Sequence, residues 1–154
     1  IAGSQSAGGV LFNLQGEVLG IITTGKAGSD MRNLISAHGI TELKKVIEKM
    51  SNGIPIPYLG ISGLDVTKEA NEKEGVPYGA FVKEVSMDSP AMLSGIQRGD
   101  VIIEMGEIKI TSFADYTSVL MQQEPGKTVE LTVLRQSQNE YKEMKFSIEV
   151  QQAE

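Results

Sequence analysis

The segment Leu59-Gly60-Ile61 carries the residue types that point most directly to chemistry. Glycine permits backbone conformations in which successive N–H groups converge, and such a group of donors attracts a carboxylate. A free chain terminus supplies a carboxylate, and the peptide behind it can add as an antiparallel strand along residues 61–64. Tyr58 and Ser62 flank the segment and complete this candidate site, although the same residues also suit an ordinary strand entry.

A helix expected over residues 113–123 would form the second wall of such a site. Two stripes run along it, one with Phe113, Thr117 and Leu120 and the other with Tyr116 and Leu120. Residues three and four apart share a helix face, so either stripe could line a ligand. Apolar helix stripes more often bury in a core. The periodicity alone therefore does not decide which of the two stripes faces the ligand.

Composition excludes several other kinds of site. The chain has 154 residues, a formal net charge of -6, no cysteine and one histidine, His38. Without cysteine there is no disulfide, thiolate zinc site or cysteine nucleophile, and one histidine cannot form a histidine metal cluster. The acidic balance argues against a nucleic-acid partner. We therefore expect no cofactor, no metal and no nucleic acid.

The length suits a folded protein that does not span a membrane. About 150 residues in one domain would bury roughly 70% of the surface of the unfolded chain. No apolar run approaches the ~18 residues of a membrane span, so we expect a soluble chain. The sequence opens within a loop-like stretch at Ile1, which suggests a fragment of a larger protein.

The first third predicts a hairpin followed by a helix. Strands are expected over residues 10–12 and 18–23, the second of them apolar on both faces, as a barrel interior requires. Residues 24–33 have the composition of a loop. Thr41 is the expected cap of a helix that ends at Asn52-Gly53. Residues 54–57, Ile-Pro-Ile-Pro, favour extended backbone and predict a linker.

The remainder predicts a mostly β fold with short α-helices. A short polar helix is expected over residues 67–74, and two further helices should begin at Ser89 and Ser112, each of which can cap a first turn. Ser112 and Asp115 fit a capping box, with Asp in place of the usual Glu. The predicted strands cover residues 59–64, 80–85, 101–105, 107–110, 129–133 and 144–150.

Several motifs resemble, in order and spacing, the PDZ domain of the HtrA family of serine proteases. They are Tyr58-Leu59-Gly60-Ile61, Gly75-Val76-Pro77-Tyr78-Gly79-Ala80-Phe81-Val82, Ser89-Pro90-Ala91, Gly95-Ile96 and Gly99-Asp100-Val101-Ile102. The resemblance implies a PDZ-like, partly open barrel or sandwich over residues 58–154. Residues 1–51 would then be a remnant of a trypsin-like protease domain, a partial barrel hairpin with its helix, and residues 52–57 the linker.

The same resemblance places Ala7 where the family has its nucleophilic serine. The family reads Gly-Asn-Ser-Gly-Gly, whereas this chain reads Gln5-Ser6-Ala7-Gly8-Gly9. A methyl group cannot attack a carbonyl, and Ser6 stands one place early in the loop. The triad histidine and aspartate would lie upstream of Ile1, and His38 does not occupy the triad position. The chain itself is therefore not expected to be an enzyme, and its parent would be a pseudoprotease or an inactivated serine endopeptidase.

By resemblance, the ligand groove would use Thr117, Leu120 and Met121 beside Leu59 and Ile61, with Tyr116 in the core. The expected partners are C-terminal peptides with apolar ends, and bulk acidity favours Lys or Arg upstream of those ends. The family further implies bacterial protein quality control outside the cytoplasm, in a secreted or membrane-anchored parent, and homo-oligomers of that parent. Two alternatives remain: a substrate-recruiting part of an active endopeptidase, or a module for subunit assembly.

Overall fold

The computed structural model describes residues 9–23, 36–138 and 140–153. The chain divides into two compact units, Ile1–Ile54 and Pro55–Glu154, and the boundary falls inside the segment predicted as a linker. Among the described residues, no helix has the length and apolar character needed to cross a membrane. The two units are described separately below.

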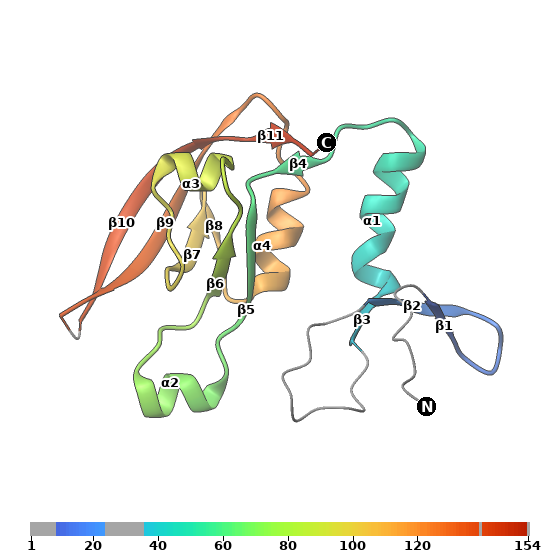
Figure 1. The fold of residues 1–154 in the computed structure, drawn as a ribbon, viewed down its shortest axis with the longest axis horizontal. Coiled ribbons are helices and arrows are strands. Elements are labelled where there is room, and N and C mark those ends of the chain that lie inside the picture. Colours follow the sequence, from blue (N-terminus) through green and yellow to red (C-terminus); the bar gives the residue numbers. More distant parts are fainter. Residues whose placement is uncertain (1–8, 24–35, 139, 154) are drawn as a thin grey trace, which may run out of the picture. The chain divides into compact units, whose positions relative to one another are not determined.

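The first unit is a small antiparallel sheet with one helix (Figure 1). Strands β1 (Gly9–Phe12), β2 (Val18–Thr23) and β3 (Ser36–Gly39) pair in that order, so the predicted hairpin is confirmed and β3 is additional. The predicted loop at residues 24–33 lies outside the described residues. Helix α1 (Ile40–Ser51) begins with Gly39 at its N-cap, so the prediction of Thr41 as the cap is wrong. Its predicted end is confirmed, with Asn52 at the C-cap.

Apolar side chains of the hairpin are exposed rather than enclosed. Val10, Leu11 and Phe12 are 48%, 45% and 57% exposed, and Leu14 in the turn is fully exposed. Adjacent strand residues point to opposite faces, so both faces of β1 are apolar and open. The sequence pattern of a barrel interior is present, but the described part of this unit provides no enclosed core for it.

The second unit is built on one six-stranded, antiparallel sheet. Its path runs β10 (Glu140–Glu149), β9 (Thr128–Ser137), β7 (Val101–Met105), β6 (Ala80–Val85) and β5 (Ile61–Asp65), and β8 (Ile108–Lys109) pairs with β7. A short ladder joins β4 (Pro57–Tyr58) to β11 (Gln151–Gln152). Helices α2 (Lys68–Glu74), α3 (Pro90–Ser94) and α4 (Phe113–Leu120) complete it. The expectation of a mostly β, partly open fold is confirmed.

The core of this unit gathers apolar residues from the central strands and from α4. Fully or nearly fully buried members include Leu59, Val82, Ile102, Leu131 and Ile148. The two predicted caps also form, because the hydroxyls of Ser89 and Ser112 accept N–H groups in the first turns of α3 and α4. The Thr67 hydroxyl, which was not predicted as a cap, accepts an N–H in the first turn of α2.

Three predicted boundaries differ from the structure. Helix α4 ends at Leu120 rather than at residue 123, because the N–H groups of Gln122 and Gln123 bond carbonyls three residues back, as in a tighter terminal turn. Strands β9 and β10 extend further than predicted and pair over ten residues each. The predicted strand 59–64 begins only at Ile61, since residues 59 and 60 form a loop after β4.

Candidate functional site

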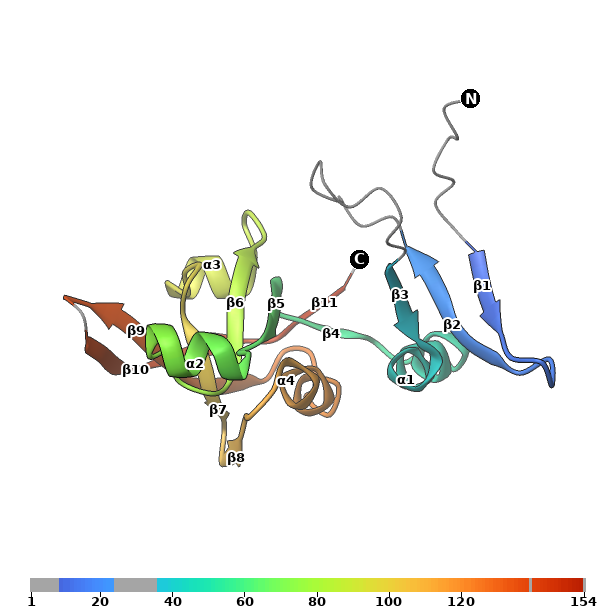
Figure 2. The ribbon, with the colours of Figure 1, turned by 90° about the horizontal axis from the view of Figure 1, so that it is seen from below.

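Strand β5 lies at one edge of the six-stranded sheet and carries the predicted site. It pairs with β6 on one side, and it is the last strand on the sheet path. Helix α4 lies beside it in both views of the fold (Figure 1; Figure 2). The predicted strand and the predicted helical wall are therefore neighbours in space, although about 50 residues separate them in the sequence.

The loop before β5 turns two N–H groups away from α3 and β6, although Gly60 itself is a buried residue. The carbonyl of Leu59 accepts the N–H of Ala91 at 3.0 Å, and the carbonyl of Gly60 accepts the N–H of Ser86 at 2.8 Å. In a planar trans peptide the N–H points opposite to the carbonyl. The N–H of Gly60 therefore points away from α3, and that of Ile61 points away from β6. These are two neighbouring donors at the start of an open strand edge.

Gly60 is required by both its backbone and its surroundings. Its φ is +80°, which glycine adopts without strain. A Cβ at this position would lie 2.2 Å from the Cβ of Ser89 and 3.0 Å from the Tyr58 hydroxyl. Ser89 caps α3, so a side chain at residue 60 would displace that helix as well as the loop. The loop and the start of α3 thus form one packed corner.

Helix α4 is tied to β5 at the far end of the strand. The Asp65 Oδ1 atom accepts the N–H of Phe113 at 2.6 Å, which joins the end of β5 to the first residue of α4. A Cβ on Gly63 would lie 2.7 Å from the Phe113 ring, so this ring packs directly on the strand where Gly63 has no side chain. These contacts fix the spacing between the two predicted walls.

The first turn of α4 has a modified capping box. The Ser112 hydroxyl accepts the N–H of Asp115 at 3.0 Å, as predicted. The Asp115 carboxylate, however, accepts both the N–H and the hydroxyl of Thr111, at 3.0 and 2.6 Å. Bonds from Thr111 are the main reason that the pKa of Asp115 lies below its ordinary value.

The predicted ligand residues contribute to the site in different ways. Leu59 is fully buried, so only its backbone can meet a ligand, and Leu120 is 7% exposed. Tyr58, Ile61, Thr117 and Met121 are half-buried, and Ser62 is exposed. Ile61 packs against the core cluster.

Tyr116 belongs to the core, as expected, and is 2% exposed. Its ring packs 5.2 Å from that of Phe113, centroid to centroid. Among the described residues its hydroxyl has no hydrogen-bond partner, and burial raises its pKa. Of the two stripes predicted on this helix, the one containing Tyr116 therefore faces inward.

Sequence reasoning missed two residues that shape the site. Asp65 was not singled out, because its partner Phe113 is 48 positions away. Arg135 was also missed, because its partner Asp100 is 35 positions away in the sequence. The one available signal was the acidic residue in the motif Gly99-Asp100-Val101-Ile102, and Asp100 is buried in the structure.

Residues 57–150 match the PDZ domain family, and the chain belongs to that family. Among curated proteins it is similar to a probable periplasmic serine endoprotease DegP-like of Ectopseudomonas mendocina, with 34% identity over 84% of this chain and 28% of the relative. It is also similar to the serine protease Do-like HtrA of Lactococcus lactis subsp. lactis, with 30% identity over 92% of this chain and 38% of the relative. The chain thus spans about a third of the length of these relatives.

Solved structures share the fold. The HtrA-type protease AlgW with a decapeptide gives a TM-score of 0.60 at 22% identity, covering 90% of this chain and 43% of that chain. The PDZ domain of HtrA3 bound to the phage-derived ligand FGRWV gives 0.52 at 24% identity, covering 63% of this chain and 86% of that chain. The resemblance to PDZ-containing HtrA proteases predicted from the motifs is confirmed.

Two further predictions concern the nucleophile position and metal binding. Ala7, at the expected nucleophile position, lies outside the described residues, so the trypsin-like origin of residues 1–51 stays a prediction. Within the described ranges no cluster of three or more His, Cys, Asp or Glu side chains could hold a metal ion.

Proposed function

We propose that the second unit captures the free C-terminus of another polypeptide. The ligand carboxylate would accept the N–H groups of Gly60 and Ile61, and the residues before it would pair with β5 as an added antiparallel strand. The observation that carries this proposal is the direction of those two N–H groups, which are turned outward because the Leu59 and Gly60 carbonyls bond inward. The peptide-bound HtrA3 PDZ domain supports it by similarity of fold.

The charge along β5 gives the ligand a direction and a preference. A peptide whose C-terminal carboxylate lies at Ile61 and which pairs antiparallel with β5 has its upstream residues beside Asp65, at the end of the strand. These upstream residues also lie near the start of α4, which contains Asp115. Both acids favour a basic residue upstream of an apolar end. A peptide array that showed a preference for upstream acids would contradict this part of the proposal.

The direct test is isothermal titration calorimetry with paired peptides. FGRWV and a panel of pentapeptides with apolar C-terminal residues are each titrated as the free acid and as the C-terminal amide. The free acids should bind at least about tenfold more tightly, because hydrogen bonds to a charged group contribute about 1.5–3 kcal/mol. Equal binding of both members across the panel would refute carboxylate capture and would favour an assembly module without a free peptide ligand.

The longer relatives support a second, wider proposal. They are named serine endoproteases, and this chain spans about a third of their length. We infer that the PDZ unit recruits substrates for, or regulates, a protease-like parent that acts outside the cytoplasm, in bacterial protein quality control, and that can form homo-oligomers. With Ala7 at the nucleophile position such a parent would be a pseudoprotease, or an endopeptidase inactivated by substitution. Restoring Ala7→Ser in the full-length parent should yield peptidase activity only in the second case.

A further inference from the structure

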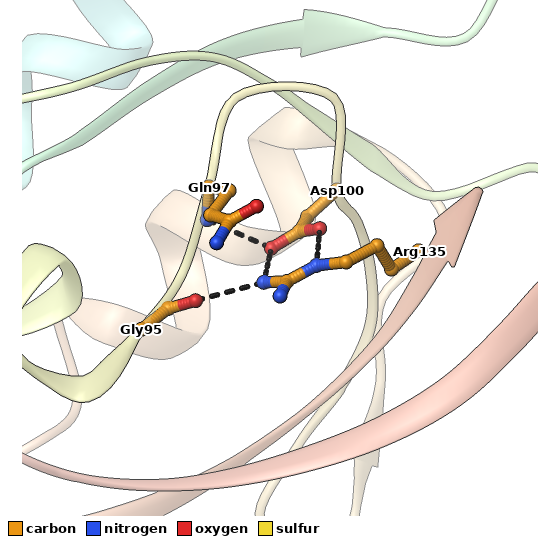
Figure 3. Close-up of polar contacts among 4 residues, drawn as sticks. All are labelled: Gly95, Gln97, Asp100 and Arg135. Carbon is orange, nitrogen blue, oxygen red and sulfur yellow. Dashed lines mark hydrogen bonds and ion pairs between the residues drawn. The ribbon is translucent and has the colours of Figure 1, made fainter. Parts of the chain in front are cut away.

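Arg135 on β9 is half-buried and bonds to the buried Asp100 carboxylate and to the Gly95 carbonyl (Figure 3). Its Nε and one Nη donate to the two carboxylate oxygens of Asp100, at 2.7 and 2.8 Å, and the same Nη donates to the carbonyl of Gly95 at 2.8 Å. The guanidinium also lies 5.4 Å from the centroid of the Phe146 ring. The Asp100 side chain is 1% exposed and also accepts the N–H of Gln97. Arg135 thus holds both ends of the loop 95–100.

Gly95 connects this contact to α3. It is the C-cap of that helix, with φ of +96°, and its carbonyl is one of the groups that a helix end leaves without an internal partner. Helix α3 has five residues, too few to be stable without anchors at its ends. Arg135 supplies the anchor at the C-terminal end.

The other end of α3 holds the peptide loop. Ser89 at the N-cap packs against Gly60 where a side chain would otherwise be, and the N–H of Ala91 fixes the carbonyl of Leu59. That second bond turns the Gly60 N–H outward. A short, rigid segment therefore links the guanidinium of Arg135 to the donors proposed to bind the carboxylate.

We propose that Arg135 is a positioning residue for carboxylate capture: it fixes α3 from its C-terminal end and so sets the direction of the loop N–H groups. This inference rests on the proposed function. Loss of Arg135 would leave the loop attached to the sheet, because Gly99 and Asp100 exchange backbone hydrogen bonds with Val82 at 2.9 and 2.8 Å. The expected defect is therefore in the placement of α3 rather than in the sheet.

The test compares the ratio of free-acid to amide affinity between variants of the whole chain, with FGRWV and the peptide panel as probes. Arg135→Lys keeps a cation beside Asp100 but loses the bidentate contact with its carboxylate. The lysine also cannot donate to the Gly95 carbonyl at the same time. It should lower the ratio by about fivefold, since one well-placed hydrogen bond is worth about 1 kcal/mol. Lys145→Met, which removes the ion pair of Lys145 with Glu130 between β10 and β9, is the matched control and should leave the ratio unchanged.

A second variant keeps the test decisive if the first fails to fold. Arg135→Met with Asp100→Asn removes both charges together, which avoids leaving a buried carboxylate unpaired. It should lower the ratio in the same way. A lower melting temperature with an unchanged ratio in the folded variants would overturn the inference and make Arg135 a stability contact only. A wild-type chain that does not distinguish acid from amide would instead refute the proposed function.

Discussion

The two edges of the six-stranded sheet differ in length and charge, and the difference favours β5 as the edge proposed to accept a peptide. β10 is ten residues long, and its exposed positions include Glu140, Lys142, Glu143 and Lys145. β5 is five residues long, has one charged residue, Asp65, and begins with outward-facing N–H donors. Charged side chains on an edge strand oppose pairing with other chains. The comparison supports the proposal that peptide binding requires an edge strand with few charged residues and a loop of N–H donors before the strand.

The largest expected effect comes from removing a donor on the receptive edge. Ile61→Pro deletes an N–H that makes no bond to β6, and proline is tolerated at such edge positions. Binding of the free-acid peptide should weaken at least about tenfold, since a bond to a charged group is lost. Titration calorimetry measures this, with Ile61→Val as the control that keeps the N–H and most of the packing. Wild-type affinity in a folded Ile61→Pro chain would show that this N–H does not bind the ligand.

A smaller effect is expected where β5 is tied to α4. Asp65→Ala removes the acceptor for the Phe113 N–H, so the start of α4 can move away from the strand. Peptide affinity should fall by about fivefold, the equivalent of one hydrogen bond of about 1 kcal/mol. Asp65→Asn keeps an acceptor oxygen and should retain most of the affinity for a panel peptide that has no basic residue. If Ala and Asn bind alike, the bond to Phe113 does not set the spacing of the site.

The protected edge can be tested by removing its charges. Lys142→Val with Glu143→Val leaves the net charge at -6 but makes the middle of β10 apolar. Because an uncharged, exposed edge invites strand pairing, this variant should self-associate more strongly than the wild type in sedimentation velocity. An unchanged sedimentation coefficient over the same concentration range would mean that charge is not what protects β10.

The smallest effect concerns the bonds of Asp115 in the first turn of α4. The pKa of Asp115 is lowered by its bonds to Thr111, so its carboxylate stabilises the fold at pH values above the ordinary 3.8. This stabilisation is lost as the pH falls from 3.8 through the lower pKa that Asp115 has in the folded state, because the carboxylate becomes protonated. Asp115→Asn should therefore melt slightly below the wild type at pH 7, and the difference should vanish in acid. A difference that persists in acid would assign the effect to something other than the carboxylate charge.

Local features of the fold were predictable from the sequence because their causes are local. The caps at Ser89 and Ser112 and the strands over residues 80–85 and 101–105 follow from nearby side chains and alternation. The pairing of β4 with β11 and the contact of Asp65 with Phe113 join segments far apart in the chain. No spacing rule reports such contacts, so these parts required the structure.

The site was predictable for a related reason and only in part. Gly60 signals its loop by its type, and its positive φ agrees with that signal. The direction of the neighbouring N–H groups depends on Ser86 and Ala91, which belong to other elements. Likewise, the burial of Leu59 and Leu120 could not be inferred from a helix stripe or a strand pattern that suits both groove and core.

The most direct test of peptide addition at β5 follows backbone amides by solution NMR as FGRWV is added. The account predicts that the amide protons of Gly60 and Ile61 shift downfield and become protected from exchange, while those of β10 do not change. The C-terminal amide of the same peptide should produce much smaller shifts at equal concentration. Shifts centred on β10, or equal shifts with acid and amide at Gly60 and Ile61, would contradict the account.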